Sequence, residues 1–122
     1  MQATLLFAHG SRDPAWAQPF EAMRARVQAA RPDAPCALAY LELMQPDVAA
    51  ACVQLAAQGV RRVRVLPVFL AAGKHLRVDL PELIAQAQAA HPQLHFEVLP
   101  PAGESAALQN AIVELALNPR GD

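Results

Sequence analysis

The sequence predicts an α/β fold in which a four-stranded parallel sheet, in the order 2-1-3-4, has helices on both faces. Short apolar segments alternate four times with longer segments of helical periodicity along the 122 residues. This alternation is typical of right-handed βαβ units, which build parallel sheets. The first segment is apolar throughout, as expected for a strand that is covered on both sides. These observations together indicate a three-layer sandwich around one sheet.

In the first half of the chain, turn residues separate two strands from two helices. The strands are predicted at residues 4–8 and 36–42, and the helices at residues 14–30 and 46–58. Asp13 can cap the first helix, which begins at Pro14, and Pro32 ends it because the residue before a proline disfavours helical backbone. Gly59 follows the second helix at a position where a left-handed residue is favoured.

In the second half, strands at 60–68 and 94–99 alternate with helices at 79–90 and 104–117. The first of these strands alternates arginines with apolar residues and then becomes wholly apolar, so it enters the core from solvent. Pro67 lacks the backbone N–H that pairing requires. We therefore expect regular pairing to stop near Leu66 and the next segment to bend outward.

Composition predicts a single domain over residues 1–117 and a flexible polar tail over residues 118–122. A formal net charge of -1, from 10 Lys and Arg against 11 Asp and Glu, provides no basic surface for nucleic acid. No apolar run approaches the roughly 20 residues that span a bilayer, and no signal sequence is evident, so we expect a cytoplasmic protein without a membrane partner. Cys36 and Cys52 are expected to be buried free thiols.

Three side chains with metal-binding chemistry follow three different strands. In a sheet of order 2-1-3-4, the topological switch point, where ligands bind, lies between strands 1 and 3. His9 follows strand 1, His75 follows strand 3, and Glu42 ends strand 2. A single histidine at a strand end is more often structural, but the convergence of three groups favours a metal site. Two imidazoles and one carboxylate suit cobalt, nickel, ferrous iron or zinc, and leave coordination positions open for a substrate.

The motifs around these residues resemble a known family. They are His9-Gly10-Ser11-Arg12, Leu41-Glu42 before a helix that begins with proline, and the segment from Pro67-Val68-Phe69-Leu70 through Gly73, His75 and Asp79-Leu80-Pro81. Together they resemble the class II tetrapyrrole chelatases of the CbiX/SirB type over roughly residues 4–115. The absence of an internal repeat is similar to the short, single-repeat form of that family.

The resemblance implies a flavodoxin-like or chelatase-like fold and the insertion of a divalent ion, Co²⁺, Fe²⁺ or Ni²⁺, into sirohydrochlorin or a related tetrapyrrole for cobalamin or sirohaem synthesis. It implies no organic cofactor, and a homodimer that rebuilds the full cleft. At the site, it implies that His9, His75 and Glu42 hold the ion or handle the pyrrole protons.

Metal insertion requires the ion to lose water ligands and the macrocycle to lose two pyrrolic protons, and histidine can serve in both steps. We assign His9 and His75 as the catalytic residues, each a metal ligand that can also accept a proton. Glu42 is assigned as a third metal ligand or as the group that orients an imidazole. The sequence leaves these roles open, and it leaves open which ion is inserted.

Cationic and hydrogen-bonding groups near the two histidines are candidates for holding the carboxylates of a tetrapyrrole. They are Ser11, Arg12, Lys74 and Arg77. Each charged group can equally be a solvated loop residue, and Ser11 can equally cap the first helix. The apolar segment 69–72 is expected either to floor the macrocycle pocket or to join a dimer contact, and Trp16 either to stack on the macrocycle or to pack against protein.

Three functions therefore compete. The first is an enzyme, a sirohydrochlorin chelatase. The second is a carrier or chaperone that binds a metal or a tetrapyrrole without catalysing insertion. The third is a structural domain in which the histidines are incidental. A nucleotide-binding function is disfavoured because the chain lacks a glycine-rich phosphate-binding motif.

Overall fold

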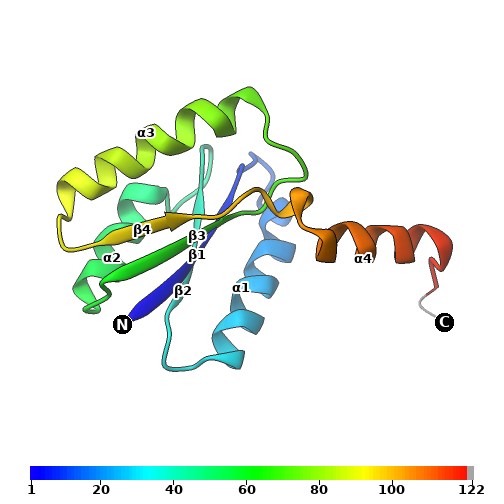
Figure 1. The fold of residues 1–122 in the computed structure, drawn as a ribbon, viewed down its shortest axis with the longest axis horizontal. Helices are drawn as coiled ribbons and strands as arrows, with labels where there is room; N and C mark the ends of the chain where they lie inside the picture. Colours follow the sequence, from blue (N-terminus) through cyan, green and yellow to red (C-terminus); the bar gives the residue numbers. More distant parts are fainter. Residues whose placement is uncertain (121–122) are drawn as a thin grey trace.

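The structure is a computed structural model that describes residues 1–120 and, at His75, the backbone alone (Figure 1). Its elements in chain order are β1 (Gln2–Ala8), η1 (Pro14–Ala17), α1 (Gln18–Ala30), β2 (Cys36–Tyr40), α2 (Val48–Ala57), β3 (Arg62–Pro67), α3 (Lys74–Ala90), β4 (His95–Val98), η2 (Ala102–Glu104) and α4 (Ala106–Leu117). The predicted flexible tail, residues 118–122, lies partly outside the described residues. Through residue 120, no helix has the length and apolarity to cross a bilayer.

The four strands form one parallel sheet in the order β2-β1-β3-β4, which confirms the predicted topology. Strand β1 is central, and its Leu6 pairs with Leu38 of β2 and with Leu66 of β3. The pairing of β1 with β3 ends at Pro67, one residue beyond the predicted point. The carboxyl ends of the two central strands therefore lie side by side at the switch point.

The two faces of the sheet are covered unequally. On one face, the main core contains Leu5 and Phe7 of β1 together with Val48, Cys52 and Leu55 of α2. A smaller cluster lies on the face that η1 and α1 cover, where buried residues of β1 and β2 pack against partly buried aromatic rings. No residue of α1 is fully buried. The first face is thus closed by this chain, and the second only in part.

Several element boundaries differ from the sequence prediction. Helix α2 begins at Val48 after its cap Asp47 rather than at Pro46, and α4 begins at Ala106 rather than at residue 104. Strand β2 ends at Tyr40 rather than at Glu42, and the first turn of the first helix is the separate 3-10 turn η1. Helix α3 begins at Lys74 rather than at residue 79, with Pro81 inside it. Burial explains this early start: Leu76 and Leu80, four residues apart, both enter the main core and hold the first turns of α3 against the sheet.

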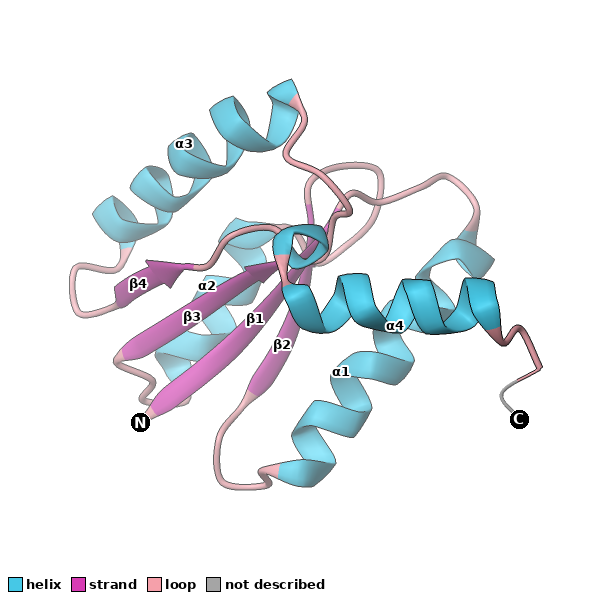
Figure 2. Cartoon of the chain, turned by 45° about the vertical axis from the view of Figure 1, so that its right-hand side comes forward, coloured by secondary structure: helices cyan, strands magenta, loops and turns pink. Residues whose placement is uncertain are grey.

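Helix α4 follows the turn η2 and projects away from the sheet, as Figures 1 and 2 both show. None of its residues is buried, although most of them are apolar. The predicted layer of helices on the second face is therefore supplied by α1 and η1, while α4 extends beyond it. A helix of this composition gains little stability in water without a covering surface.

Candidate metal site

Backbone pairing beyond the strand ends brings His9 and Glu42 together. The N–H of Leu41 donates to the Ala8 carbonyl at 2.8 Å, and the N–H of Glu42 donates to the His9 carbonyl at 3.1 Å. The parallel ladder between β1 and β2 thus continues past both strands. It places His9 Nε2 3.1 Å from Glu42 Oε1, with the two side chains 48% and 55% exposed. Solvent and ligands can reach both groups.

Gly10 permits this close approach of the two chain segments. Its φ is +99°, and a Cβ at this position would collide with the carbonyl oxygen of Glu42. Any other residue would push the Glu42 backbone away and would also be strained by the left-handed conformation. The glycine that follows His9 is therefore a geometric requirement of the pair.

The His9 imidazole also rests against a stack of aromatic rings. The Phe69 ring lies 6.1 Å from the His9 ring and 5.8 Å from the Phe7 ring, with interplanar angles of 18° and 19°. Phe7 is fully buried, so the stack extends from the core to the exposed imidazole. Packing against Phe69 restricts the plane of the imidazole while Glu42 fixes its Nε2 edge. The Phe69 ring thus supports His9, and both expectations for segment 69–72 stay predictions.

The spacing of the two polar atoms suits metal coordination as well as a hydrogen bond. Ligand atoms about 2.1 Å from one ion lie about 3.0 Å apart in octahedral and about 3.4 Å apart in tetrahedral geometry. The separation of 3.1 Å between His9 Nε2 and Glu42 Oε1 falls between these values. One ion can therefore replace the shared proton with little movement of either side chain.

The third predicted ligand, His75, lies in the first turn of α3, and its side chain is outside the described part of the structure. Among the side chains that are described, no group of three or more His, Cys, Asp or Glu residues could hold a metal ion. His9 and Glu42 thus form a two-residue site, for which His75 stays the predicted third ligand.

The four predicted substrate contacts have different surroundings. Ser11 accepts a hydrogen bond from the Asp13 N–H at 3.1 Å, whereas Asp13 itself caps η1 by accepting from the Ala15 N–H at 3.0 Å. The predicted cap is therefore Asp13, and Ser11 shapes the turn before it. Arg12 and Lys74 are exposed.

Arg77 is exposed and lines an apolar groove of about 540 Å³ between α3 and β4, together with Leu80 and Phe96. Among the described side chains, no hydrogen bond or ion pair joins Ser11, Arg12, Lys74 or Arg77 to the His9–Glu42 pair. A charged group beside an open site can nevertheless hold a carboxylate that extends from a bound macrocycle.

Trp16, whose ring is the other candidate to stack on the macrocycle, packs within the protein. Its indole lies 4.4 Å from the Phe20 ring and 6.3 Å from the Tyr40 ring, measured between centroids. Trp16 is half-buried in the cluster that η1 and α1 cover. The packing interpretation is therefore the one that the structure favours.

The two cysteines are unsuited to bind the ion. Both are buried and unpaired. Burial raises the pKa of the Cys52 thiol to about 11, and it also raises the pKa of Cys36 although Arg24 acts in the opposite direction. Both thiols are therefore protonated at neutral pH, and a protonated thiol is a poor metal ligand.

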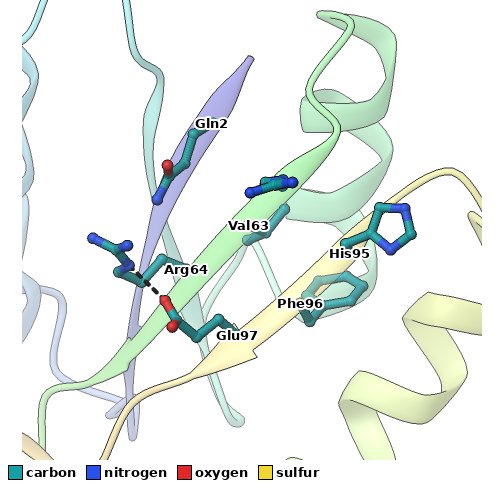
Figure 3. A pocket seen from close by; sticks show the side chains of 7 residues that line it. Gln2, Val63, Arg64, His95, Phe96 and Glu97 are labelled. Atoms are coloured by element: carbon teal, nitrogen blue, oxygen red, sulfur yellow. Dashed lines mark hydrogen bonds and ion pairs between the residues drawn. The ribbon is translucent and has the colours of Figure 1, made fainter.

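A second polar cluster lies at the opposite end of the sheet. It lines a pocket of about 410 Å³, and Figure 3 shows the lining side chains, among them Gln2, Arg64, His95 and Glu97. Arg64 Nε donates to Glu97 Oε1 at 2.7 Å, so the carboxylate is already paired. His95 is level with Gln2 through the pairing of both residues with Arg62, at the amino ends of the strands. It is thus remote from His9.

Comparison with known proteins identifies relatives of the whole fold. The model of the CbiX family matches residues 3–118. The sirohydrochlorin cobaltochelatase of Methanothermobacter thermautotrophicus is 35% identical over 80 residues, and that of Methanopyrus kandleri is 34% identical over 84 residues. These alignments include 66% and 69% of the present chain. They span only 55% and 59% of the two relatives.

Two solved structures show the same architecture. A CbiX protein from Marinobacter aquaeolei, 32% identical, superposes with a TM-score of 0.87 over 98% of this chain and 97% of its own. The sirohydrochlorin chelatase SirB from Bacillus subtilis subspecies spizizenii, solved in complex with cobalt, is 28% identical with a TM-score of 0.78. The match covers 96% of this chain and 50% of SirB. The present fold therefore corresponds to one half of SirB.

Proposed function

The chain belongs to the CbiX family, and from this premise we propose that it inserts a divalent metal ion, Co²⁺, Fe²⁺ or Ni²⁺, into sirohydrochlorin or a related tetrapyrrole. The observation that carries the proposal is the His9–Glu42 pair, with its 3.1 Å separation, at the carboxyl edge of the sheet. Two relatives are named sirohydrochlorin cobaltochelatase, and SirB was solved with cobalt. The metal and the tetrapyrrole are both substrates in this reaction.

The proposed chemistry exchanges one ion for two protons. The incoming M²⁺ loses water, binds the macrocycle nitrogens and displaces two pyrrolic protons, so charge is conserved when the protein accepts both protons. His9 holds the ion first and accepts a proton once its nitrogen is released. His75 takes the second proton, and Glu42 holds the ion beside His9 or receives a hydrogen bond from the protonated imidazole. Phe69 keeps the His9 ring in one plane through these steps.

The substrate carries several carboxylates, and the exposed cations around the site supply their counter-charges. Arg12 is three residues from His9 in the sequence, and Lys74 and Arg77 flank His75. Ser11 contributes its side chain and backbone at the start of the turn before η1. We assign these four residues to substrate binding, with the guanidinium groups able to bind carboxylates through two hydrogen bonds.

We infer that the active form is a homodimer in the cytoplasm. The chain matches half of SirB, and the described site is open, with both ligands about half exposed. A second copy of the chain would supply the other wall of the cleft that a macrocycle needs. The dimer would then offer two copies of each ligand around one substrate cavity.

The activity is tested by following the optical spectrum of sirohydrochlorin with Co²⁺ at substoichiometric protein. Catalysis accelerates the spectral change through many turnovers. We expect His9→Ala and His75→Ala each to lower the rate by about 100-fold or more, the scale for losing a proton acceptor. His95→Ala is the matched control, because this exposed histidine lies at the opposite end of the sheet. Normal rates in both of the first two variants would exclude their proposed roles.

The same assay separates the enzyme from the carrier. A carrier changes the spectrum only in proportion to the amount of protein, with no further turnover. Binding of Co²⁺ alone, measured by its visible absorption, should weaken in His9→Ala and in Glu42→Gln and remain normal in His95→Ala. Stoichiometric change with intact Co²⁺ binding would replace the chelatase proposal with the carrier function.

A pair of glycine substitutions tests the geometry of the site. Gly10→Ala should disrupt the His9–Glu42 contact, because its Cβ meets the Glu42 carbonyl. Gly59→Ala is the matched control: Gly59 also has a positive φ, +84°, but no atom lies within 4 Å of its would-be Cβ. Both variants carry backbone strain of about 1–2 kcal/mol. Only Gly10→Ala is expected to lose metal binding and insertion as well.

A further inference from the structure

Two exposed leucines lie on either side of the His9–Glu42 pair. Leu43 follows Glu42 on the β2 side of the sheet, and Leu70 follows Phe69 on the β3 side. The two leucines are 56% and 70% exposed. Because neighbouring strands lie about 4.8 Å apart, the segments that follow β2 and β3 are separated by about 10 Å, and His9 follows the central strand between them. The metal pair is therefore bracketed by two apolar side chains that this chain leaves in water.

Leu43 adopts a backbone conformation that glycine prefers. Its φ is +68°, and it is the only non-glycine residue with a positive φ among those that the structure describes. The left-handed conformation brings the Cβ of an L-residue too close to the following carbonyl oxygen, whereas glycine adopts it freely. The exposed leucine side chain is also unfavourable in water. Both features indicate that the side chain contacts something that the single chain does not contain.

Both neighbours of Leu43 are held by the rest of the fold. The Glu42 carbonyl lies so close to Gly10 that a Cβ there would collide with it. On the other side, the Met44 side chain packs into the cluster that η1 and α1 cover. A rotation of Leu43 towards the core would displace Glu42 or Met44. The Leu43 side chain is thus presented beside the metal pair by a segment that is anchored at both ends.

Leu70 is held in place by the turn η2. A Cβ on Gly103 would collide with the Leu70 carbonyl, and the N–H of Gly103 donates to the Phe69 carbonyl at 2.8 Å. Of the four glycines that the structure describes, only Gly10 and Gly103 make approaches this close. Each of these glycines therefore fixes one of the two segments that carry an exposed leucine at the site.

The direction from which a metal ion enters a tetrapyrrole determines what these leucines contact. The nitrogens that receive the ion lie at the centre of the flat macrocycle, so the ion reaches them through a face and not past the edge. The face is apolar, whereas the carboxylates extend from the edge. Groups that surround the metal ligands therefore meet the apolar face, for which aliphatic side chains are the suitable contacts.

We propose that Leu43 and Leu70 contact one face of the tetrapyrrole on opposite sides of the entering ion and hold the macrocycle independently of the metal. This inference rests on the proposed function and specifies the apolar part of its substrate site. A second copy of the chain would cover both leucines only by closing the metal pair to the substrate, which favours the macrocycle as the occupant. Burial by the macrocycle offsets the unfavourable exposure of both side chains.

The first test measures the binding of metal-free sirohydrochlorin, followed by its absorption spectrum, to variants in which asparagine replaces leucine. Asparagine tolerates the left-handed conformation, so Leu43→Asn removes the apolar side chain and keeps the backbone. We expect Leu43→Asn and Leu70→Asn each to raise the dissociation constant about tenfold. Val53→Asn is the matched control, because Val53, in the middle of α2, is 56% exposed, as is Leu43. A dissociation constant unchanged in both leucine variants would overturn the proposal.

Co²⁺ binding separates a substrate contact from a support for the metal ligands. We expect both leucine variants to bind Co²⁺ alone as tightly as the wild type does, measured by visible absorption. In insertion assays, the KM for sirohydrochlorin should rise about tenfold while kcat stays within about twofold. Weaker Co²⁺ binding in either variant would show instead that the leucine positions His9 or Glu42, and would contradict the proposed contact.

A glycine at position 43 separates binding from stability. Glycine adopts a φ of +68° without strain, so Leu43→Gly should unfold at a temperature equal to or above that of the wild type. It should nevertheless bind sirohydrochlorin about tenfold more weakly and keep the wild-type mass in light scattering. A lower mass would show that Leu43 contacts a second copy of the chain. A lower unfolding temperature would show that it supports the fold, and either result would refute the substrate contact.

The outcomes for the leucines and for the enzyme are independent. If the wild type inserts Co²⁺ catalytically and both leucine variants bind the macrocycle normally, the contact is disproved and the chelatase proposal stands. If the wild type binds sirohydrochlorin through the leucines but shows no turnover with Co²⁺, the chelatase proposal fails and the contact stands.

Discussion

Helices α2 and α4 have similar sequences and opposite environments. Both are short, with 10 and 12 residues, and both are rich in alanine and branched apolar side chains. Both begin at a side-chain cap, Asp47 accepting from the Ala50 N–H and Ser105 from the Ala107 N–H. Yet α2 buries four residues, and α4 buries none.

This difference teaches that local sequence specifies a helix and its apolar surface but not what covers that surface. The cap, the absence of internal glycine and proline, and the spacing of apolar residues act within about four residues. The cover comes from the tertiary fold for α2, which packs against β2 of the sheet and against its neighbouring helix α3. For α4 no such cover exists within the described part of the chain, and the second copy in the proposed homodimer is one surface that can supply it.

The largest expected effect comes from truncating one leucine in each of the two helices. Leu55→Ala on α2 removes a fully buried side chain and should lower the free energy of unfolding by about 2–5 kcal/mol. Leu115→Ala on α4 should cost less than about 0.5 kcal/mol at protein concentrations where the single chain prevails. Urea unfolding measures both.

Protein concentration sharpens this contrast. If α4 is covered by a second copy, the loss caused by Leu115→Ala should grow as the concentration rises, while the loss caused by Leu55→Ala should be present at every concentration. A Leu115→Ala loss that stayed below about 0.5 kcal/mol throughout would argue against the covering of α4 in the dimer.

The sequence predicted the helices and the sheet order because both depend on short-range patterns and chain topology. The order β2-β1 makes His9 and Glu42 neighbours, so their contact also follows from where the two strands end. The early start of α3 at Lys74 was not predictable, because burial of Leu76 outweighs the proline at position 81. The stacking of Phe69 on His9 and the closeness of Gly10 to Glu42 arise from tertiary packing, which leaves no local signal beyond the glycine itself.

A smaller effect comes from the Cys52 thiol at the centre of α2. Its pKa is about 11 in the folded chain, against 9.0 for an ordinary cysteine, because burial disfavours the thiolate. The unfolded chain therefore loses this proton first as the pH rises. The stability that the protonated thiol provides is complete below pH 9 and is lost progressively between pH 9 and about 11, by at most about 2–3 kcal/mol.

Urea unfolding of the wild type and of Cys52→Ala from pH 7 to 11 measures this contribution, because every other group that titrates at alkaline pH is present in both proteins. The variant should lose stability less steeply above pH 9. Parallel curves for the two proteins would show that the thiol is more solvated than its burial within α2 indicates. Helix α4 contains no cysteine, so it has no counterpart to this contribution.

The smallest expected effect comes from removing the N-terminal cap of α2 or of α4. These substitutions separate the local stability of a helix from the global stability of the fold. Asp47→Ala and Ser105→Ala each remove one side-chain hydrogen bond at the start of a helix, which costs about 1 kcal/mol of helix stability. Because α2 unfolds with the core, Asp47→Ala should lower the global free energy of unfolding by this amount. Ser105→Ala in the single chain should instead accelerate amide hydrogen exchange in the first turns of α4 and leave the exchange of β1 unchanged.

If a second copy covers α4, dimer formation links the stability of this helix to association. At high concentration, amide exchange in α4 then slows in the wild type, and Ser105→Ala weakens association, because ordering an uncapped helix costs more free energy. Equal global losses for both caps in the single chain would mean that α4 already unfolds together with its own core.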